Sequence, residues 1–307
     1  MEPIRIEELV KVYKKGLRQQ KVLAVDDLHL TVAEGEIFGF LGPNGAGKST
    51  TIKVLCDLIR PTNGRATILG RDVRDPAARR QMGYLPENPS YYPFLTAWEL
   101  LRFHGELHGM GEAALRTRGG ELLAVMELAD AAHRPLRTYS KGMVQRFGIA
   151  AALIHDPQLL ILDEPMSGLD PLGRKLVIDL MADLRNRGKT IFFSTHILAD
   201  VETICDRIGV LVGGKLVYEG AMEAVRSSAI RYYEVIFDGD PEKVSALAWP
   251  VPGGPRRQAD LHLLEVRPEH LETAIRFLLD QGLRITRIEP KRARLEELFT
   301  DLAGGRR

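Results

Sequence analysis

Uninterrupted apolar runs recur along the first two thirds of the chain and predict buried strands. Residues 37–41 read Ile-Phe-Gly-Phe-Leu and residues 159–162 read Leu-Leu-Ile-Leu. Residues 190–195, Thr-Ile-Phe-Phe-Ser-Thr, have an apolar centre and indicate another strand of the buried type. Runs without polar alternation are typical of strands covered on both faces of a parallel sheet. After the first run, apolar residues recur at helical spacing at Ile52, Leu55, Leu58 and Ile59. The pattern therefore predicts an α/β fold.

Alternation with period two marks the N-terminal segment, and a helical pattern marks the middle of the chain. Residues 4–12 and 21–32 contain alternating stretches, which predict two strands joined by a loop at 14–20. Residues 95–132 carry apolar faces at helical spacing, and we expect Gly119 and Gly120 to interrupt the second helix there. Because this block breaks the alternation of strand and helix, we expect an inserted helical subdomain at about residues 90–150.

The composition changes near residues 221–230, where the motif-bearing pattern ends. Beyond this point the pattern predicts strands at 232–237, 261–266 and 283–288, and helices at 271–279 and 295–302. We therefore expect two domains, residues 1–222 and a small α+β domain at 223–307. Basic residues cluster in the second domain at Arg284, Arg287, Lys291, Arg292 and Arg294. We interpret this cluster as a solvated face, with binding of an acidic lipid or partner as the alternative.

The charge balance and the absence of long apolar runs exclude several classes of protein. The 307 residues include 42 Lys and Arg and 41 Asp and Glu. The chain therefore lacks the overall basic charge that would indicate nucleic acid binding. The sequence contains no run of 18 apolar residues, so it predicts no membrane span, and the first eight residues lack a signal-peptide core. Cys56 and Cys205 fall in predicted helices without metal-ligand spacing, which indicates reduced, packed thiols.

Residues 42–49 match the phosphate-loop pattern G-x-x-x-x-G-K-S/T between a predicted strand and a predicted helix. Glycines let successive backbone N–H groups point at phosphate oxygens, and the following helix adds its positive N-terminal end. We expect Lys48 to reach the β- and γ-phosphates and the Ser49 hydroxyl to ligate Mg²⁺. The alternative, a glycine-rich turn without a ligand, is disfavoured by the flanking strand and helix.

Polar residues follow the other two buried runs directly. Asp163 and Glu164 end the run at 159–162, and His196 follows the run at 190–195. Two carboxylates at the end of a buried strand cost free energy unless they have partners or a chemical role. Beside a phosphate loop, the first is expected to hold Mg²⁺ and the second to take a proton from an attacking water. His196 is a candidate to touch a phosphate. The alternatives are two exposed loop acids and a structural histidine.

Three further residues have both a functional and a plain structural interpretation. Tyr13 lies at the edge of the predicted loop, where it is a candidate to stack on adenine or a half-buried strand tyrosine. Glu87 follows a strand that begins at Met82, where ligands often bind, or it is a solvated acid. Ser140 is expected to cap a helix, and a second anion could sit at that helix start. From these stretches alone the structural interpretation is preferred.

The order of these motifs resembles the ATP-binding subunits of ABC transporters over about residues 4–220. The resemblance implies a P-loop NTPase core of the ABC ATPase type, with an antiparallel β subdomain and a helical subdomain. It implies ATP and Mg²⁺ as ligands, with Glu164 as general base and with Lys48 and His196 as further catalytic residues. The implied nucleotide contacts are Tyr13, Gly42, Pro43, Asn44, Gly45, Ala46, Gly47, Lys48, Ser49, Thr50, Ser140, Gly142 and Asp170. The implied Mg²⁺ ligands are Ser49, Glu87 and Asp163.

Two positions depart from the usual pattern of that family. Residues 139–143 read Tyr-Ser-Lys-Gly-Met where the usual signature is Leu-Ser-Gly-Gly-Gln, and Glu87 stands where most relatives have a glutamine. Ser140 and Gly142 are kept, so a phosphate-facing hydroxyl and a close backbone approach remain. Both departures, together with the small C-terminal module, resemble the type-two branch of ABC exporters.

The resemblance also implies partners and a location. Two copies of the chain would close head to tail over two ATP molecules and drive a separate transmembrane permease. The helical insert and the Glu87 loop are the docking surface that the resemblance implies. We expect an exporter at the cytoplasmic face of the inner membrane, peripheral through the permease, without nucleic acid. The alternative is a soluble ABC ATPase that does mechanical work on nucleic acid or ribosomes. A P-loop kinase or GTPase is a third class, against which Asp163, Glu164, the signature and His196 argue.

Overall fold

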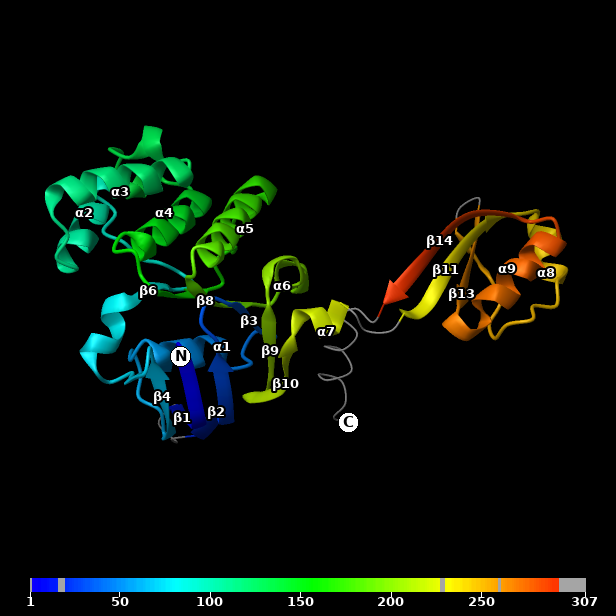
Figure 1. Ribbon diagram of the computed structural model, residues 1–307, viewed down its shortest axis with the longest axis horizontal. Helices are drawn as coiled ribbons and strands as arrows, with labels where there is room; N and C mark the ends of the chain where they lie inside the picture. Colours follow the sequence, from blue (N-terminus) through cyan, green and yellow to red (C-terminus); the bar gives the residue numbers. More distant parts are fainter. Residues whose placement is uncertain (1, 16–19, 227–229, 259–260, 293–307) are drawn as a thin grey trace. The chain divides into compact units, whose positions relative to one another are not determined.

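The computed structural model describes residues 2–15, 20–226, 230–258 and 261–292. The chain divides into two compact units, Met1–Met222 and Glu223–Arg307, each of which is described by itself. Figure 1 shows the elements coloured along the chain. Most of the predicted loop at 14–20, the predicted helix at 295–302, Arg294 and the side chain of Arg292 lie outside the described residues.

A six-stranded sheet forms the centre of the first unit, with strand order β10-β9-β3-β8-β7-β6. Neighbouring strands are parallel except for the antiparallel pair β9 and β10. Every residue of β3, β7 and β8 is buried, as the apolar runs predict. The strands are β3 (Ile37–Leu41), β6 (Met82–Leu85), β7 (Leu159–Asp163), β8 (Thr190–Thr195), β9 (Arg207–Val212) and β10 (Lys215–Ala221).

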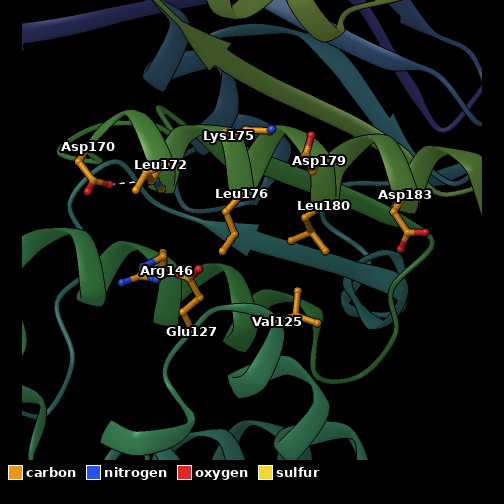
Figure 2. Close-up of a pocket in the computed structure, with 11 residues that line it drawn as sticks. Val125, Glu127, Arg146, Asp170, Leu172, Lys175, Leu176, Asp179, Leu180 and Asp183 are labelled. Atoms are coloured by element: carbon orange, nitrogen blue, oxygen red, sulfur yellow. Dashed lines mark hydrogen bonds and ion pairs between the residues drawn. The ribbon is translucent and has the colours of Figure 1, made fainter.

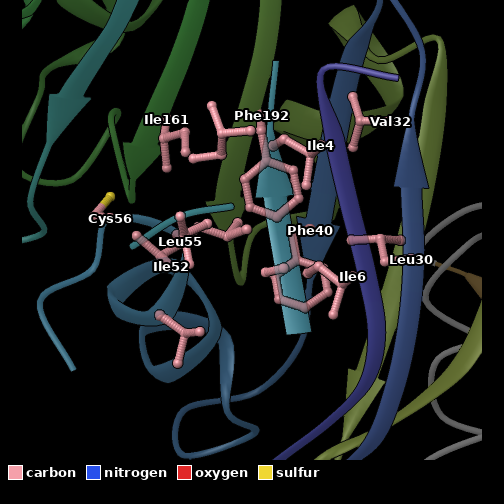
Figure 3. Close-up of a cluster of buried hydrophobic side chains, with 14 of the residues drawn as sticks. Ile4, Ile6, Leu30, Val32, Phe40, Ile52, Leu55, Cys56, Ile161 and Phe192 are labelled. Carbon is pink, nitrogen blue, oxygen red and sulfur yellow. The ribbon is translucent and has the colours of Figure 1, made fainter. Parts of the chain in front are cut away.

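A second, antiparallel sheet packs against the same core. Its strand order is β2-β1-β4-β5, with β1 (Ile4–Lys15), β2 (Gln20–Val32), β4 (Asn63–Ile68) and β5 (Arg71–Asp72). Figure 3 shows side chains of β1, β2, β3 and β8 meeting those of helix α1 (Lys48–Leu55) in one buried cluster. Because the helix after the phosphate loop is buried between the two sheets, the loop itself is held on a rigid base.

Helix α1 is shorter than the sequence pattern predicts. It ends at Leu55, and Leu58, which was expected to continue its apolar stripe, is 58% exposed. The chain turns at Asp57, which adopts φ 57° and pairs with Arg60 and Arg79. The left-handed conformation of Asp57 cannot continue a right-handed helix.

The helical subdomain consists of α2 (Ala97–Leu107), α3 (Glu112–Val125) and α4 (Lys141–Leu153), which Figure 1 shows grouped away from the antiparallel sheet. The expected interruption at Gly119 and Gly120 is wrong, because α3 continues through both. A Cβ on Gly119 would lie 3.0 Å from the Trp98 ring, whereas one on Gly120 would meet nothing within 4 Å. Gly119 therefore permits close packing with the start of α2 rather than breaking its own helix.

Three more helices complete the first unit and its boundary: α5 (Pro171–Asn186), α6 (Leu198–Ile204) and α7 (Met222–Arg226). Short 3₁₀ segments lie at Pro76–Gln81, Ala129–Ala131 and Leu136–Thr138. Cys56 and Cys205 directly follow α1 and α6 rather than lying within them, and both are buried. Burial raises the pKa of the Cys56 thiol, so that it stays protonated. Within the described residues, no helix has the length and apolar character needed to cross a membrane.

The second unit is a four-stranded antiparallel sheet with helices in its connections. The succession β-α-β-β-α-β with order β12-β13-β11-β14 is that of a ferredoxin-like fold. Val235, Phe237, Leu264 and Leu278 form its core. The sequence pattern missed α8 and β12. The elements are β11 (Ile230–Asp238), α8 (Pro241–Ala246), β12 (Arg256–Gln258), β13 (Leu261–Val266), a 3₁₀ segment (Pro268–His270), α9 (Leu271–Asp280) and β14 (Arg284–Arg292).

The basic cluster on β14 is mixed in charge. Arg287 and Lys291 both pair with Glu289, and Lys291 also pairs with Glu234 at 2.8 Å. These carboxylates neutralise the cations that an acidic ligand would need. The structure therefore favours the interpretation of a solvated face.

Candidate functional site

The C-terminal ends of three neighbouring parallel strands bring the predicted residues together. β3 leads into the phosphate loop, β7 ends at Asp163 and is followed by Glu164, and β8 is followed by His196. β8 pairs with β3 on one side and with β7 on the other, all in parallel. Because parallel strands end at one edge of the sheet, residues far apart in the sequence meet there.

Glycine conformation shapes the phosphate loop. Gly47 caps α1 with φ 112°, and a Cβ there would lie 2.4 Å from the Ala24 carbonyl oxygen. No other residue fits this position without a backbone shift. Lys48 is 5% exposed, and its ammonium donates to the carbonyl oxygens of Gly42 (2.6 Å) and Pro43 (3.3 Å). Two backbone carbonyl oxygens of the loop thus hold the Lys48 ammonium in place.

A cavity of about 240 Å³ lies over this loop. Residues of the loop and of α1 line it together with two carboxylates, Glu87 and Glu164. Its lining residues are Ala24, Pro43, Asn44, Gly45, Ala46, Gly47, Lys48, Ser49, Thr50, Glu87 and Glu164. Gly42, the remaining predicted residue of the loop, does not line the cavity, and a Cβ there would approach the Leu211 carbonyl oxygen to 2.5 Å.

Asp163 is buried beside the cavity and is satisfied by hydroxyl groups. The Ser49 hydroxyl donates to its Oδ1 at 3.3 Å, and the Ser194 hydroxyl donates to the same oxygen at 2.5 Å. The Ser49 hydroxyl and Asp163 offer adjacent oxygen atoms, and Glu87 lines the same cavity as Ser49. Oxygen ligands suit a hard cation such as Mg²⁺. No cluster of three His, Cys, Asp or Glu side chains capable of holding a metal occurs within the described ranges. A cation here would therefore need the hydroxyl, water and ligand oxygens as well.

Glu164 lies between two nitrogen-bearing side chains. Its Oε1 is 3.6 Å from the Lys48 Nζ, and both its carboxylate oxygens are 3.0 Å from Nδ1 of His196. Its backbone has φ 50°, and its N–H donates to the Ser194 hydroxyl at 3.0 Å. A non-glycine residue in this region costs about 1–3 kcal/mol and persists where the surroundings hold it. The strained backbone aims the carboxylate into the cavity.

Sequence reasoning missed Gln145, which supports Glu164 from the helical subdomain. It is 2% exposed, and its Nε2 donates to the carbonyl oxygens of Glu164 and Pro165, both at 3.1 Å. The sequence feature that could have indicated it is a polar side chain among the buried, otherwise apolar positions of α4. Gln145 ties the helix that Ser140 begins to the loop that carries Glu164.

Ser140, Gly142 and Asp170 do not line the cavity of their own chain. The Ser140 hydroxyl accepts from the Met143 N–H at 3.2 Å and caps α4, and Asp170 accepts from the Gly173 N–H at 2.8 Å and caps α5. A Cβ on Gly142 would lie 3.3 Å from the Gly168 carbonyl oxygen, so the first turn of α4 packs against the loop before α5. The three residues form a second surface rather than part of the first site.

Tyr13 lies at the end of the phosphate loop. It is 37% exposed, and its hydroxyl is 3.5 Å from the Thr50 Oγ1, a residue that lines the cavity. The Lys11 ammonium lies over the ring at 5.2 Å from its centroid. Tyr13 therefore sits within reach of the cavity rim, with an aromatic ring that is still partly accessible.

A larger cavity of about 580 Å³ lies between α5 on one side and the end of α3 with Arg146 of α4 on the other. Figure 2 shows Leu176 and Leu180 of α5 facing Val125 across it, with Arg146 and Glu127 on the far wall. Of the predicted site residues, only Asp170 lines it. Charged side chains line both cavities, but only the smaller one is formed by the phosphate loop together with Lys48 and Glu164. We therefore take the smaller cavity as the candidate site.

Comparisons with known proteins agree with this arrangement. A family model described as "ABC transporter" matches residues 25–167. An ABC transporter ATP-binding protein of Synechocystis is 47% identical over 242 residues, which are 77% of this chain and 67% of that protein. The fluoroquinolones export ATP-binding protein of Mycobacterium tuberculosis is 36% identical over 306 residues, 99% of this chain and 94% of that protein.

A similar solved structure is a dimeric ATP-binding cassette in a post-hydrolysis state, bound to ADP and phosphate. It superposes with a TM-score of 0.66 at 26% sequence identity, over 71% of this chain and 98% of that one.

Proposed function

Since this chain belongs to the ATP-binding proteins of ABC transporters, and so binds and hydrolyses ATP, we propose that it drives export through a separate membrane permease. The observation that carries the hydrolytic part is the placement of Glu164 between Lys48 and His196 at the side of the phosphate cavity. The direction of transport rests on the relative named for fluoroquinolone export, which matches 99% of this chain. The names of the relatives disfavour a soluble ATPase acting on nucleic acid or ribosomes.

Glu164 is the general base of our proposal. Its carboxylate takes a proton from the water that attacks the γ-phosphate. The Nδ1 of His196 lies 3.0 Å from that carboxylate, which orients it and leaves Nε2 as the nitrogen that can touch the γ-phosphate. His196 thereby positions the base and senses the phosphate with the same ring.

Lys48 and the loop glycines bind the triphosphate. The Lys48 ammonium moves from the carbonyl oxygens of Gly42 and Pro43 to the β- and γ-phosphates, which are the stronger acceptors. Tyr13 stacks on the adenine, since its ring lies at the rim formed by Thr50.

Ser49, Asp163 and Glu87 are the residues that would hold Mg²⁺. Asp163 and the two cavity carboxylates outnumber the single ammonium of Lys48, and a triphosphate adds further negative charge. A divalent cation bound here would neutralise charge on the β- and γ-phosphates as the bond breaks. Glu87 in place of a glutamine increases the need for that cation.

A second copy of the chain completes the site. Ser140 and Gly142 start a 13-residue helix, so its N-terminal end offers backbone N–H groups to an anion, yet neither residue lines the cavity of its own chain. A head-to-tail pair would place this helix start, together with Asp170, against the γ-phosphate bound by the partner. The dimeric arrangement of the similar solved cassette supports this proposal.

The permease docks on the helical insert and the loop after Glu87. Large apolar side chains are unusually exposed there: Tyr92 is 71% exposed, Phe94 78%, Phe103 49% and Leu107 66%. Phe103 and Leu107 lie one turn apart on α2, so they share a face. Such a surface is typical of a protein interface. Docking would hold the chain at the cytoplasmic face of the inner membrane, with residues 223–307 as an accessory domain.

The test is an affinity capture of tagged Glu164→Gln from detergent-solubilised native membranes in Mg-ATP, followed by mass spectrometry. We expect a polytopic membrane protein at near-equal stoichiometry. A matched capture with Phe94→Ser and Phe103→Ser added should lose that protein while still binding ATP. Recovery of ribosomal or DNA-associated proteins in its place would contradict the proposal.

A further inference from the structure

Asp200 is a buried carboxylate between α5 and α6 that none of the roles above uses. It is 5% exposed, and its Oδ2 is fully buried without a hydrogen-bond partner among the residues that the structure describes. Its Oδ1 lies 3.9 Å from Nη1 of Arg174, which is an ion pair but too long for a hydrogen bond. Buried acceptors of this kind are rare and call for an explanation.

The position of Asp200 connects the two segments that surround the reacting groups. It lies in the first turn of α6, which begins two residues after His196. Its partner Arg174 lies one turn into α5, the helix that Asp170 caps. Burial raises the pKa of the Asp200 carboxyl. The charge of Glu164 also raises this pKa, whereas Arg174 and His196 lower it. The carboxylate is therefore within electrostatic reach of both Glu164 and His196.

The rest of α6 is fixed to the central sheet. A Cβ on Gly39 of β3 would approach the Cys205 Sγ to 2.6 Å and the Val201 Cγ1 to 3.2 Å, so this side of α6 packs closely on the strand. On the other side, the contact of α6 with α5 includes the Asp200–Arg174 pair. The Asp200–Arg174 pair is thus a contact through which α5 can act on the first turn of α6 and on the His196 loop before it.

We propose that Asp200 and Arg174 form a positioning pair that holds the His196 loop against Glu164 and couples the orientation of α5 to hydrolysis. The pair rests on the proposed function, since it acts through His196. A shift of about 1 Å between α5 and α6 brings the guanidinium within hydrogen-bond distance of the carboxylate. A second copy that contacts Asp170 would act on α5 one turn from Arg174. The loose pair then becomes a tight one as the dimer closes.

A purely structural role makes a different prediction from a positioning role. An ionised carboxylate without hydrogen bonds is costly to bury, so replacing it by the isosteric amide should leave thermal stability unchanged or raise it. Loss of the charge should nevertheless loosen the His196 loop and slow hydrolysis. Activity and stability thus move independently if Asp200 positions, and fall together if it only supports the fold.

The experiment compares the full-length chain with Asp200→Asn, Arg174→Met and the double variant, measuring kcat, the KM for ATP and the melting temperature. We expect a fall in kcat of about 10-fold or more in each single variant, with an unchanged KM. The melting temperature should hold in Asp200→Asn, whereas Arg174→Met leaves a buried carboxylate without its cation and should lower it. The double variant should be no slower than the singles, since both remove one interaction. Asp179→Asn, at an exposed position of α5, is the matched control and should retain wild-type kcat.

An unchanged kcat in Asp200→Asn would overturn the proposal, as would a fall in kcat that follows a fall in melting temperature, or additive losses in the double variant. Should Asp200→Asn fail to fold, Arg174→Met decides alone by its kcat, measured well below its melting temperature, and an unchanged kcat there would overturn the proposal. Glu164→Gln, run in parallel, separates the two levels. If it retains turnover, the proposed function fails. If it is inactive while Asp200→Asn is unimpaired, only the positioning pair fails.

Discussion

The Nδ1 atom of His196 lies 3.0 Å from both carboxylate oxygens of Glu164, although 32 positions separate the two residues in the sequence. The contact follows from the sheet. β7 and β8 are parallel, with Asp163 opposite Ser194, so the residues that follow each strand emerge side by side. The Ser194 hydroxyl then fixes the backbone of Glu164 and the side chain of Asp163 at once. The end of β8 thus positions two of the acidic residues of the site, Asp163 and Glu164.

Replacing Lys48 by alanine should weaken ATP binding itself. The ammonium donates to two carbonyl oxygens of the loop, and Lys48 lines the cavity in which the triphosphate is proposed to bind. Its removal takes a positive charge from the triphosphate, so we expect the dissociation constant for ATP to rise at least about 10-fold, measured by isothermal titration calorimetry. Lys53→Ala, an exposed position on the same helix, is the control. An ATP affinity unchanged by Lys48→Ala would contradict the role assigned to it.

Gln145→Leu should lower both stability and turnover. The substitution leaves the carbonyl oxygens of Glu164 and Pro165 without their buried donor, which costs about 1–3 kcal/mol. It also frees the loop that carries the base, so kcat should fall while the KM for ATP changes little. Thermal melting and steady-state ATPase assays check both effects. Gln158→Ala, at an exposed side chain, should show neither. A Gln145→Leu variant that is both as stable and as active as the wild type would show that the hydrogen bonds from Gln145 are dispensable.

Gly120→Ala should stabilise the chain, and Gly119→Ala should not. Both glycines lie inside α3, where alanine is favoured over glycine by about 1 kcal/mol. A Cβ at position 120 meets nothing within 4 Å, so the gain is realised, whereas at position 119 it would lie 3.0 Å from the Trp98 ring. Chemical denaturation of the two variants and the wild type measures the difference. Equal effects of the two substitutions would mean that the close packing on Trp98 carries no cost.

Stability should decline with pH below about 6.5 because of His155. Its ring stacks on His108 with centroids 3.8 Å apart, and its Nδ1 is buried without a partner within the described residues. Burial, with smaller contributions from His108 and Arg118, lowers the pKa of His155 to about 4. The unfolded chain therefore takes up a proton more readily than the folded one, so the stability present above pH 6.5 is lost as the pH falls toward 4.

Melting temperatures of the wild type and of His155→Gln at pH 7.5 and pH 5 check this dependence. The drop between the two pH values should be smaller in the variant. His133→Gln, an exposed position of the same subdomain, should keep the wild-type drop. Equal drops in the wild type and His155→Gln would show that another group controls acid stability.

The sequence predicts much of the site because the relevant rules are local. The apolar runs mark β3, β7 and β8, and parallel strands place their following residues at one edge, which brings the Lys48 loop, Asp163, Glu164 and His196 together. Helix capping by Ser140 follows from residue type and position alone. Each of these features depends on a few adjacent residues.

The features that the sequence does not predict depend on packing between distant segments. Gln145 supports Glu164 from another subdomain, and no short pattern announces that contact. α3 continues through Gly119 and Gly120 despite the low helix propensity of glycine, and at Gly119 it packs closely on Trp98 of another helix. The left-handed backbone of Glu164 arises from the neighbouring Ser194, since no glycine marks the turn.

The most direct test of the account is the ATPase activity of Glu164→Gln, measured beside its ATP affinity in the same preparation. An amide keeps the shape of the side chain but cannot accept the proton of the attacking water. We expect ATP to bind with near wild-type affinity and kcat to fall by about 100-fold or more. Glu121→Gln, at an exposed position of α3, is the control and should turn over normally. Near wild-type hydrolysis by Glu164→Gln would contradict the assignment of Glu164 as the base.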